Sequence, residues 1–145
     1  MVSIYLSNVH IRGSAIHYAG QYLGGHLDFN DFKSLPQDAH STWYNVLERA
    51  LKREVKEEVN IEIENIEYIT SLILSHDDSH ATLIISCLAD YKSGEVTIQE
   101  EEVETFVWAT FEEAKSYDLM DGILDELVMA ENKRKGIKTE WQRFN

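Results

Sequence analysis

One helix stands out in the pattern of apolar and polar residues, and we expect it to run from Trp43 to Val59. Ser41 or Thr42 is a suitable N-cap residue. Asn60 suits the other end, because asparagine tolerates the left-handed backbone found there. At 3.6 residues per turn, the apolar positions form one arc that should face the rest of the protein. These positions are Leu47, Ala50, Leu51 and Val55.

Short strands are predicted before and after this helix, where β-branched residues gather. The predicted strands are Ser3–Leu6, Val9–Ile11, Ala15–Tyr18, Gln21–Leu27, Ile61–Ser75, Ala81–Tyr91, Glu95–Ile98 and Glu104–Ala109. Two further helices are predicted at Glu112–Tyr117 and Gly122–Asn132. Because strands precede and follow a central helix, we expect an α/β fold with a mixed sheet covered by helices.

The chain has 145 residues, of which 43% are hydrophobic and 27% are charged. These values are typical of one globular domain, and we interpret residues 1–145 as a single domain. A polar loop is expected near residues 29–42, and a basic, aromatic tail at 133–145. Trp141 and Phe144 in that tail leave a homodimer open as an alternative.

The net charge of −13 narrows the class of ligand. So negative a surface should repel polymeric nucleic acid, whose binding depends on neutralising phosphates. A small phosphorylated substrate remains compatible, because a divalent cation can bridge acidic protein groups and an anion. The first residues are a poor match to a secretory signal, and no apolar run approaches about 18 residues. With Cys87 as the single cysteine, we therefore expect a cytoplasmic protein without membrane contact.

Three carboxylates of the central helix lie on its apolar side. Glu54 and Glu58 fall inside the apolar arc, and Glu57 falls at its edge. Buried carboxylates need a compensating cation, and a hard divalent cation prefers oxygen ligands. The ordinary alternative is a solvated helix with ion pairs such as Arg53–Glu57. That alternative does not explain why the acids share the apolar side.

The segment REVKEEVNI at residues 53–61 resembles the second half of the Nudix box, Arg-Glu-apolar-x-Glu-Glu-x-Gly-apolar. Residues 24–29, GGHLDF, resemble the Gly-Gly opening of that motif. Residues 104–114 are similar to the strand and helix that follow it in Nudix proteins. The resemblance covers the chain from Gly24 to about Leu127, and it implies a Nudix-like α/β/α sandwich with a mixed sheet packed between helices.

The resemblance also implies roles for the helix residues. Glu54, Glu57 and Glu58 would be ligands of Mg²⁺ or Mn²⁺, and the Gly24 carbonyl would add a further oxygen. Arg53 would orient the carboxylates through charge-assisted hydrogen bonds. The implied reaction is attack of a metal-activated water on a diphosphate linkage, in a nucleoside diphosphate derivative or a nucleoside triphosphate.

Other candidate residues lie outside the helix. Nudix proteins often take a further acid from a loop before the late strand, and Glu102, six residues before Trp108, is our candidate for the general base or an extra ligand. A solvent-exposed turn is the alternative for the acidic residues 100–102. His26 is a candidate for phosphate contact, with a structural role at a strand edge as the alternative. Tyr22 and Trp43 are candidates for stacking on a base, although such aromatic residues more often belong to the core.

The sequence departs from the Nudix pattern at three points. Asn45 stands where the first glutamate of the box belongs, eight positions before Arg53. About a dozen extra residues lie between the glycine pair and the helix, and Asn60 replaces the last glycine. Two alternatives therefore stay open: a Nudix-like domain that binds a nucleotide with little or no catalysis, and an acidic interaction module without metal.

Overall fold

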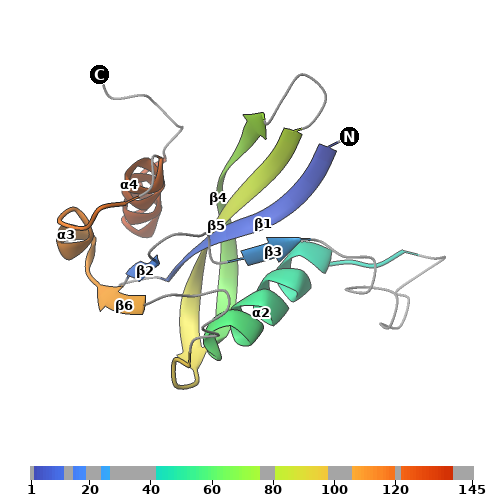
Figure 1. Cartoon of the computed structure of the whole chain (residues 1–145), viewed down its shortest axis with the longest axis horizontal. Coiled ribbons are helices and arrows are strands. Elements are labelled where there is room, and N and C mark those ends of the chain that lie inside the picture. The colour runs from blue at the N-terminus through green and yellow to red at the C-terminus, as the bar shows by residue number, and fades with distance from the viewer. Residues whose placement is uncertain are drawn as a thin grey trace.

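A computed structural model of the chain describes residues 2–11, 15–18, 24–26, 42–75, 81–97, 106–119 and 122–138. Its centre is a four-stranded sheet in the order β3-β1-β5-β4 (Figure 1). The strands are β3 (Gly24–His26), β1 (Val2–Ile11), β5 (Ala81–Ser93) and β4 (Glu62–Ser75). β1 is parallel to β5, while the other two pairings are antiparallel, so the predicted mixed sheet is confirmed.

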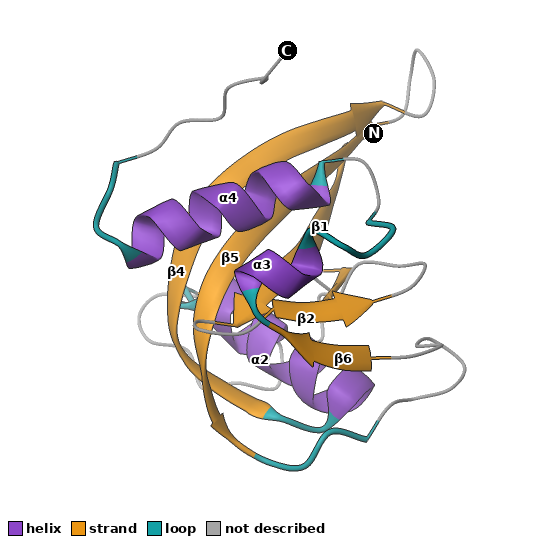
Figure 2. Cartoon of the chain, turned by 90° about the vertical axis from the view of Figure 1, so that its left-hand side faces the viewer, coloured by secondary structure: helices purple, strands orange, loops and turns teal. Residues whose placement is uncertain are grey.

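Two more strands form a separate antiparallel pair, β2 (Ala15–Tyr18) with β6 (Phe106–Ala109). Helix α2 (Val46–Val59) lies on one side of the large sheet. α3 (Phe111–Ala114) and α4 (Ile123–Arg134) lie on the other side (Figure 2). The expected sandwich of helices around a mixed sheet is therefore present. No helix in the described ranges is long and apolar enough to cross a membrane.

The core between α2 and the sheet explains why this helix is held so firmly. Its apolar arc buries Ala50, Leu51, Val55 and Val59. Those side chains pack with Ile61, which precedes β4, and with Ile63 of β4 and Ala89 of β5. Burying a side chain of this size is worth about 1.5–3 kcal/mol, so the helix is fixed mainly by this contact and not by its own propensity.

The predicted start of the central helix is wrong by three residues. The helix begins at Val46, and its N-cap is Asn45, in a left-handed conformation with φ of 54°. The Asn45 carbonyl accepts the Arg49 N–H at 3.1 Å, whereas its side chain makes no capping bond. The prediction that Leu47 faces inward is also wrong. Leu47 lies in the first turn of the helix and is 39% exposed, and the first buried side chain is that of Ala50.

The strands also differ from the prediction in length and number. The two short strands predicted within residues 3–11 form one strand, β1, with an irregular register between Leu6 and Val9. Residues 95–97, the described part of the strand predicted at Glu95–Ile98, are irregular. Of the predicted polar loop, residues 29–41 lie outside the described residues, as does the tail beyond residue 138.

Cys87 offers a test of the packing beneath α2. Burial raises the pKa of its thiol to about 11, and the nearby Glu48 carboxylate adds to the effect. Only about one thiol in a thousand is then ionised at pH 8, and the thiolate is the reactive form. We expect Ellman's reagent to modify the folded protein about 100-fold more slowly than the protein in 6 M guanidinium chloride. Equal rates in the two states would contradict this packing.

Candidate functional site

The second half of α2 presents three carboxylates at different depths. The side chain of Glu54 is 13% exposed and that of Glu57 is 53% exposed. Glu58 is buried, with 5% of its surface exposed. This gradient follows the helical wheel, which placed Glu54 and Glu58 inside the apolar arc and Glu57 at its edge. A helix merely solvated on its acidic side would leave all three exposed.

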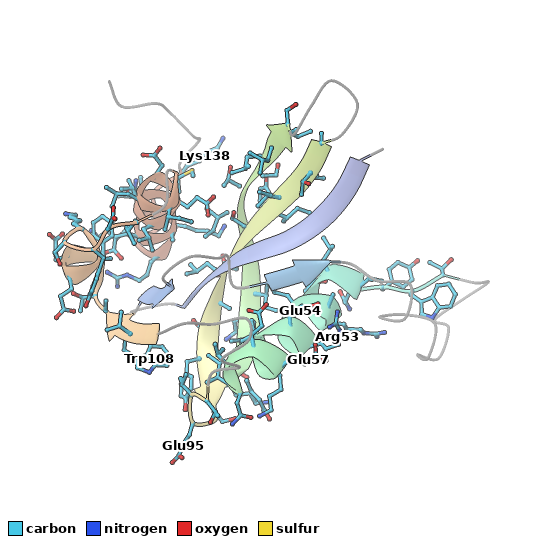
Figure 3. The ribbon with its side chains drawn as sticks, viewed as in Figure 1. Arg53, Glu54, Glu57, Glu95, Trp108 and Lys138 are labelled. Carbon is cyan, nitrogen blue, oxygen red and sulfur yellow. The ribbon has the colours of Figure 1, made fainter. Side chains whose placement is uncertain are left out.

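Arg53 joins two of these carboxylates. Its Nη2 atom lies 2.7 Å from Oε1 of Glu54, and its Nη1 atom lies 2.7 Å from Oε2 of Glu57 (Figure 3). Both are charge-assisted contacts at short distance, and the planar guanidinium makes them at the same time. Arg53 therefore fixes the orientation of both acids.

Hydrogen bonds join the C-terminal end of α2 to residues 95–97. Asn60 adopts the left-handed conformation with φ of 59°, and its N–H donates to the Lys56 carbonyl, so the predicted helix end is confirmed. Its side-chain Nδ2 also donates to the carbonyl of Glu95 at 3.1 Å. In addition, the Thr97 N–H donates to the Val59 carbonyl at 3.1 Å. Asparagine thus keeps the backbone shape of the expected glycine and adds a contact that glycine cannot make.

Asn45, which stands where the Nudix box has its first glutamate, is exposed at the start of α2. Arg53 contacts Glu54 and Glu57 on its own helix. One turn before Arg53, the Nη1 atom of Arg49 is buried and has no hydrogen-bond partner in the part of the chain that is described. Arg49 was not among the candidate residues that the sequence indicated.

The structure brings β3 next to α2 (Figure 1). Gly24 lies opposite Ser7 of β1, and His26 lies opposite Tyr5, so the glycine pair and the carboxylate helix are neighbours although the sequence separates them. Trp43 precedes α2 and is partly buried. The other two candidates, Tyr22 and Glu102, lie outside the described residues.

The carboxylate oxygens of this site are the donors that Mg²⁺ and Mn²⁺ prefer. Within the described ranges, however, no group of three or more His, Cys, Asp or Glu side chains is arranged to hold a metal ion. Glu54 and Glu57 are instead directed toward the guanidinium of Arg53. The chemistry of the donors therefore fits a divalent cation, provided that the cation competes with Arg53 for these two carboxylates.

Comparison with known proteins agrees with this geometry. A family model described as the NUDIX domain matches residues 42–129, which is more than half of the chain. This chain belongs to the Nudix family. The match begins just before α2 and ends inside α4, so it contains the whole carboxylate helix of this Nudix domain. The family resemblance of residues 53–61 is thereby confirmed.

Curated relatives share part of the Nudix domain. The NAD-capped RNA hydrolase NudC of Haemophilus influenzae (strain PittEE) is 38% identical over 66 residues, which cover 46% of this chain and 24% of that protein. NudC of Pseudomonas aeruginosa (strain LESB58) is 40% identical over 62 residues, covering 43% and 21%. The similarity thus spans about a quarter of the length of these relatives.

Solved structures show the same fold. A MutT NUDIX hydrolase from Burkholderia pseudomallei superimposes with a TM-score of 0.66 and 18% identity, covering 89% of this chain and 98% of that one. The E. coli ORF135 protein superimposes with a TM-score of 0.62 and 18% identity, covering 93% and 92%. These matches confirm the architecture of the Nudix domain.

Proposed function

We propose that this Nudix domain hydrolyses a diphosphate linkage in a nucleotide derivative, with Mg²⁺ or Mn²⁺ as cofactor. The observation that carries the proposal is the pair of contacts from Arg53 to Glu54 and Glu57. They orient two acids on the half-buried side of a helix, and this helix lies within the Nudix match. A helix that served only for stability gains little from such a pair, since exposed ion pairs are worth about 0–1 kcal/mol.

Glu54, Glu57 and Glu58 would hold the cation, together with the carbonyl oxygen of Gly24. When bound, the cation supplies positive charge that activates water and offsets the charge of the leaving phosphate. Arg53 keeps Glu54 and Glu57 oriented before the cation binds, and its guanidinium stays positive throughout. Glu102 is our candidate for the base that takes a proton from the attacking water. The water oxygen forms a new bond to phosphorus while the bond to the bridging oxygen breaks.

The substrate we propose is a small nucleoside diphosphate derivative. The curated relatives are named for hydrolysis of NAD-capped RNA, and NAD contains a diphosphate linkage between two nucleosides. The net charge of −13 argues against tight binding of the RNA polymer itself. We therefore favour the dinucleotide or a related compound over the capped polymer. His26, Tyr22 and Trp43 remain our candidates for contacts with phosphate and base, and the cytoplasm is the compartment where we place the reaction.

The decisive test is turnover of a substrate panel with increasing Mg²⁺ or Mn²⁺. The panel should hold NAD⁺, ADP-ribose, nucleotide sugars, dinucleoside polyphosphates and nucleoside triphosphates. We expect two phosphorylated products from at least one compound, with cleavage abolished by EDTA. If the cation raises the melting temperature but nothing is cleaved, the domain binds nucleotides without hydrolysis. If the cation has no effect on stability, the acidic interaction module is the better interpretation.

A further inference from the structure

Strand β4 lies at the edge of the large sheet and pairs with β5 alone among the described strands. The first half of its free edge carries the features that prevent edge-to-edge association. Charged residues occur there at Glu62, Glu64 and Glu67. Its register with β5 is also irregular at several points up to Thr70. This half of the edge is therefore protected from pairing with another chain.

The second half of β4 lacks these features. From Thr70 to Ser75 the register with β5 is unbroken, and no charged residue or proline occurs between Tyr68 and Ser75. Ile73 is 62% exposed and Leu74 is 47% exposed, on opposite faces of the strand. The outer ends of β4, β5 and β1 also extend beyond the helices (Figures 1 and 2). An exposed, regular and apolar edge of this kind is a template for another strand.

The sequence of this half is a palindrome centred on Ile73: Ser71, Leu72, Ile73, Leu74, Ser75. In an antiparallel pair around a two-fold axis at Ile73, this residue lies opposite its own copy. Leu72 then lies opposite Leu74 of the second copy, and Ser71 lies opposite Ser75. Each apolar side chain thus meets an apolar one and each serine meets a serine, which is the self-complementarity that a symmetric dimer requires. We propose that residues 71–75 pair two copies of this chain into one continuous sheet.

Charge favours a pairing centred on the second half of β4 over one centred on its first half. Two chains that each carry −13 repel, so a stable contact must keep their acidic residues apart. With the axis at Ile73, the two copies of Glu67 lie twelve residues apart along the paired strands, or about 40 Å at 3.3 Å per residue. That distance is several Debye lengths at physiological salt. A register that paired residues 62–67 would place glutamates near each other.

The interface is short, so we expect a weak, concentration-dependent dimer with a dissociation constant on the order of 10 µM. Sedimentation velocity from 1 to 300 µM measures it directly. Ile73→Lys places two like charges opposite each other at the axis, and we expect it to weaken the dimer about 100-fold. The matched control is Ile137→Lys, at another exposed isoleucine, 52% exposed, after α4. A wild-type chain that stays monomeric to 300 µM, or an Ile73→Lys variant that dimerises as the control does, overturns the proposal.

Disulfide cross-linking tests the register between the two copies of β4. A cross-link is a gain of signal, so a variant that merely fails to fold does not produce the expected pattern. In a Cys87→Ala background, Ile73→Cys should form a disulfide-linked dimer on oxidation, since directly opposed residues have Cα atoms about 4.5–5.5 Å apart. Ser71→Cys and Ser75→Cys should each fail alone, because their copies lie about 13 Å apart along the strands. Mixed together, these two variants should cross-link. Cross-linking of Ser71→Cys with itself at the rate of Ile73→Cys overturns this register. The proposal does not depend on the proposed enzymatic function.

Discussion

Replacing Glu57 by glutamine is expected to lower kcat for diphosphate hydrolysis about a thousand-fold, which is the loss typical of removing one group that stabilises developing charge. Glutamine keeps the size of the side chain but gives up the negative charge that a cation would bind. It also ends the ion pair with Arg53. Because the side chain is 53% exposed, the packing beneath α2 should be unchanged. Steady-state kinetics on the substrate found by the panel measures the effect.

The matched control is Glu112→Gln on α3, which removes an exposed carboxylate that pairs with Lys115 at 2.8 Å, away from the candidate site. We expect this variant to keep full activity. The Glu57 variant should also lose most of the rise in melting temperature that Mn²⁺ causes in the wild type. Glu58 is a poorer choice for this experiment, because it is 5% exposed and its replacement would disturb folding and activity together. Wild-type turnover by the Glu57→Gln variant would contradict the role of Glu57 as a ligand of the cation.

Replacing Gly94 by alanine is expected to reduce the free energy of unfolding by about 3 kcal/mol, from backbone strain together with overpacking. Gly94 has φ of +107°, a conformation that L residues rarely adopt. An added Cβ would lie 2.6 Å from the carbonyl oxygen of Asn60 and 3.0 Å from Cα of Ile61. Both contacts are with backbone atoms at the end of α2, which cannot rotate away as a side chain can. Urea unfolding measures the difference.

Two other glycines separate backbone strain from close packing. Gly122 and Gly136 also have positive φ, +89° and +72°, yet an added Cβ would meet nothing within 4 Å at either position. We expect Gly122→Ala and Gly136→Ala to cost about 1 kcal/mol each, as strain alone. If Gly94→Ala costs no more than these two, the segment after β5 does not press against the end of α2 as described.

Much of the fold around α2 could be predicted from sequence because local periodicity sets it. The helical arc gave the buried Ala50, Leu51 and Val55 correctly, and the choice of Asn60 for the helix end followed from its tolerance of a left-handed backbone. The start of the helix could not be predicted this way. Trp43 and Tyr44 fit a helical pattern, and the left-handed turn at Asn45 is fixed by surroundings that a wheel does not contain.

The candidate site likewise has features that the sequence could predict and features that it could not. The depth of Glu54, Glu57 and Glu58 follows from their spacing on one helix, so sequence was enough. The contact between Asn60 and Glu95 joins residues 35 positions apart, and only the folded chain brings them together. Periodicity likewise indicates strands but not their partners, so it gave no sign that β1 would lie parallel to β5. Glu102 and Tyr22 stay predictions.

We expect that parallel pairing to form after the local pairing of β4 with β5. β4 and β5 are close in sequence and can pair locally. β1 cannot pair with β5 until Ala81, the partner of Val2, has been synthesised. β1 in turn links β3 to the rest of the sheet. On the ribosome, about 80 residues separate the two strands, or roughly 5–15 s of synthesis. Contacts of such long range close late in folding. We therefore expect the glycine pair of β3 and the carboxylate helix to come together late in folding.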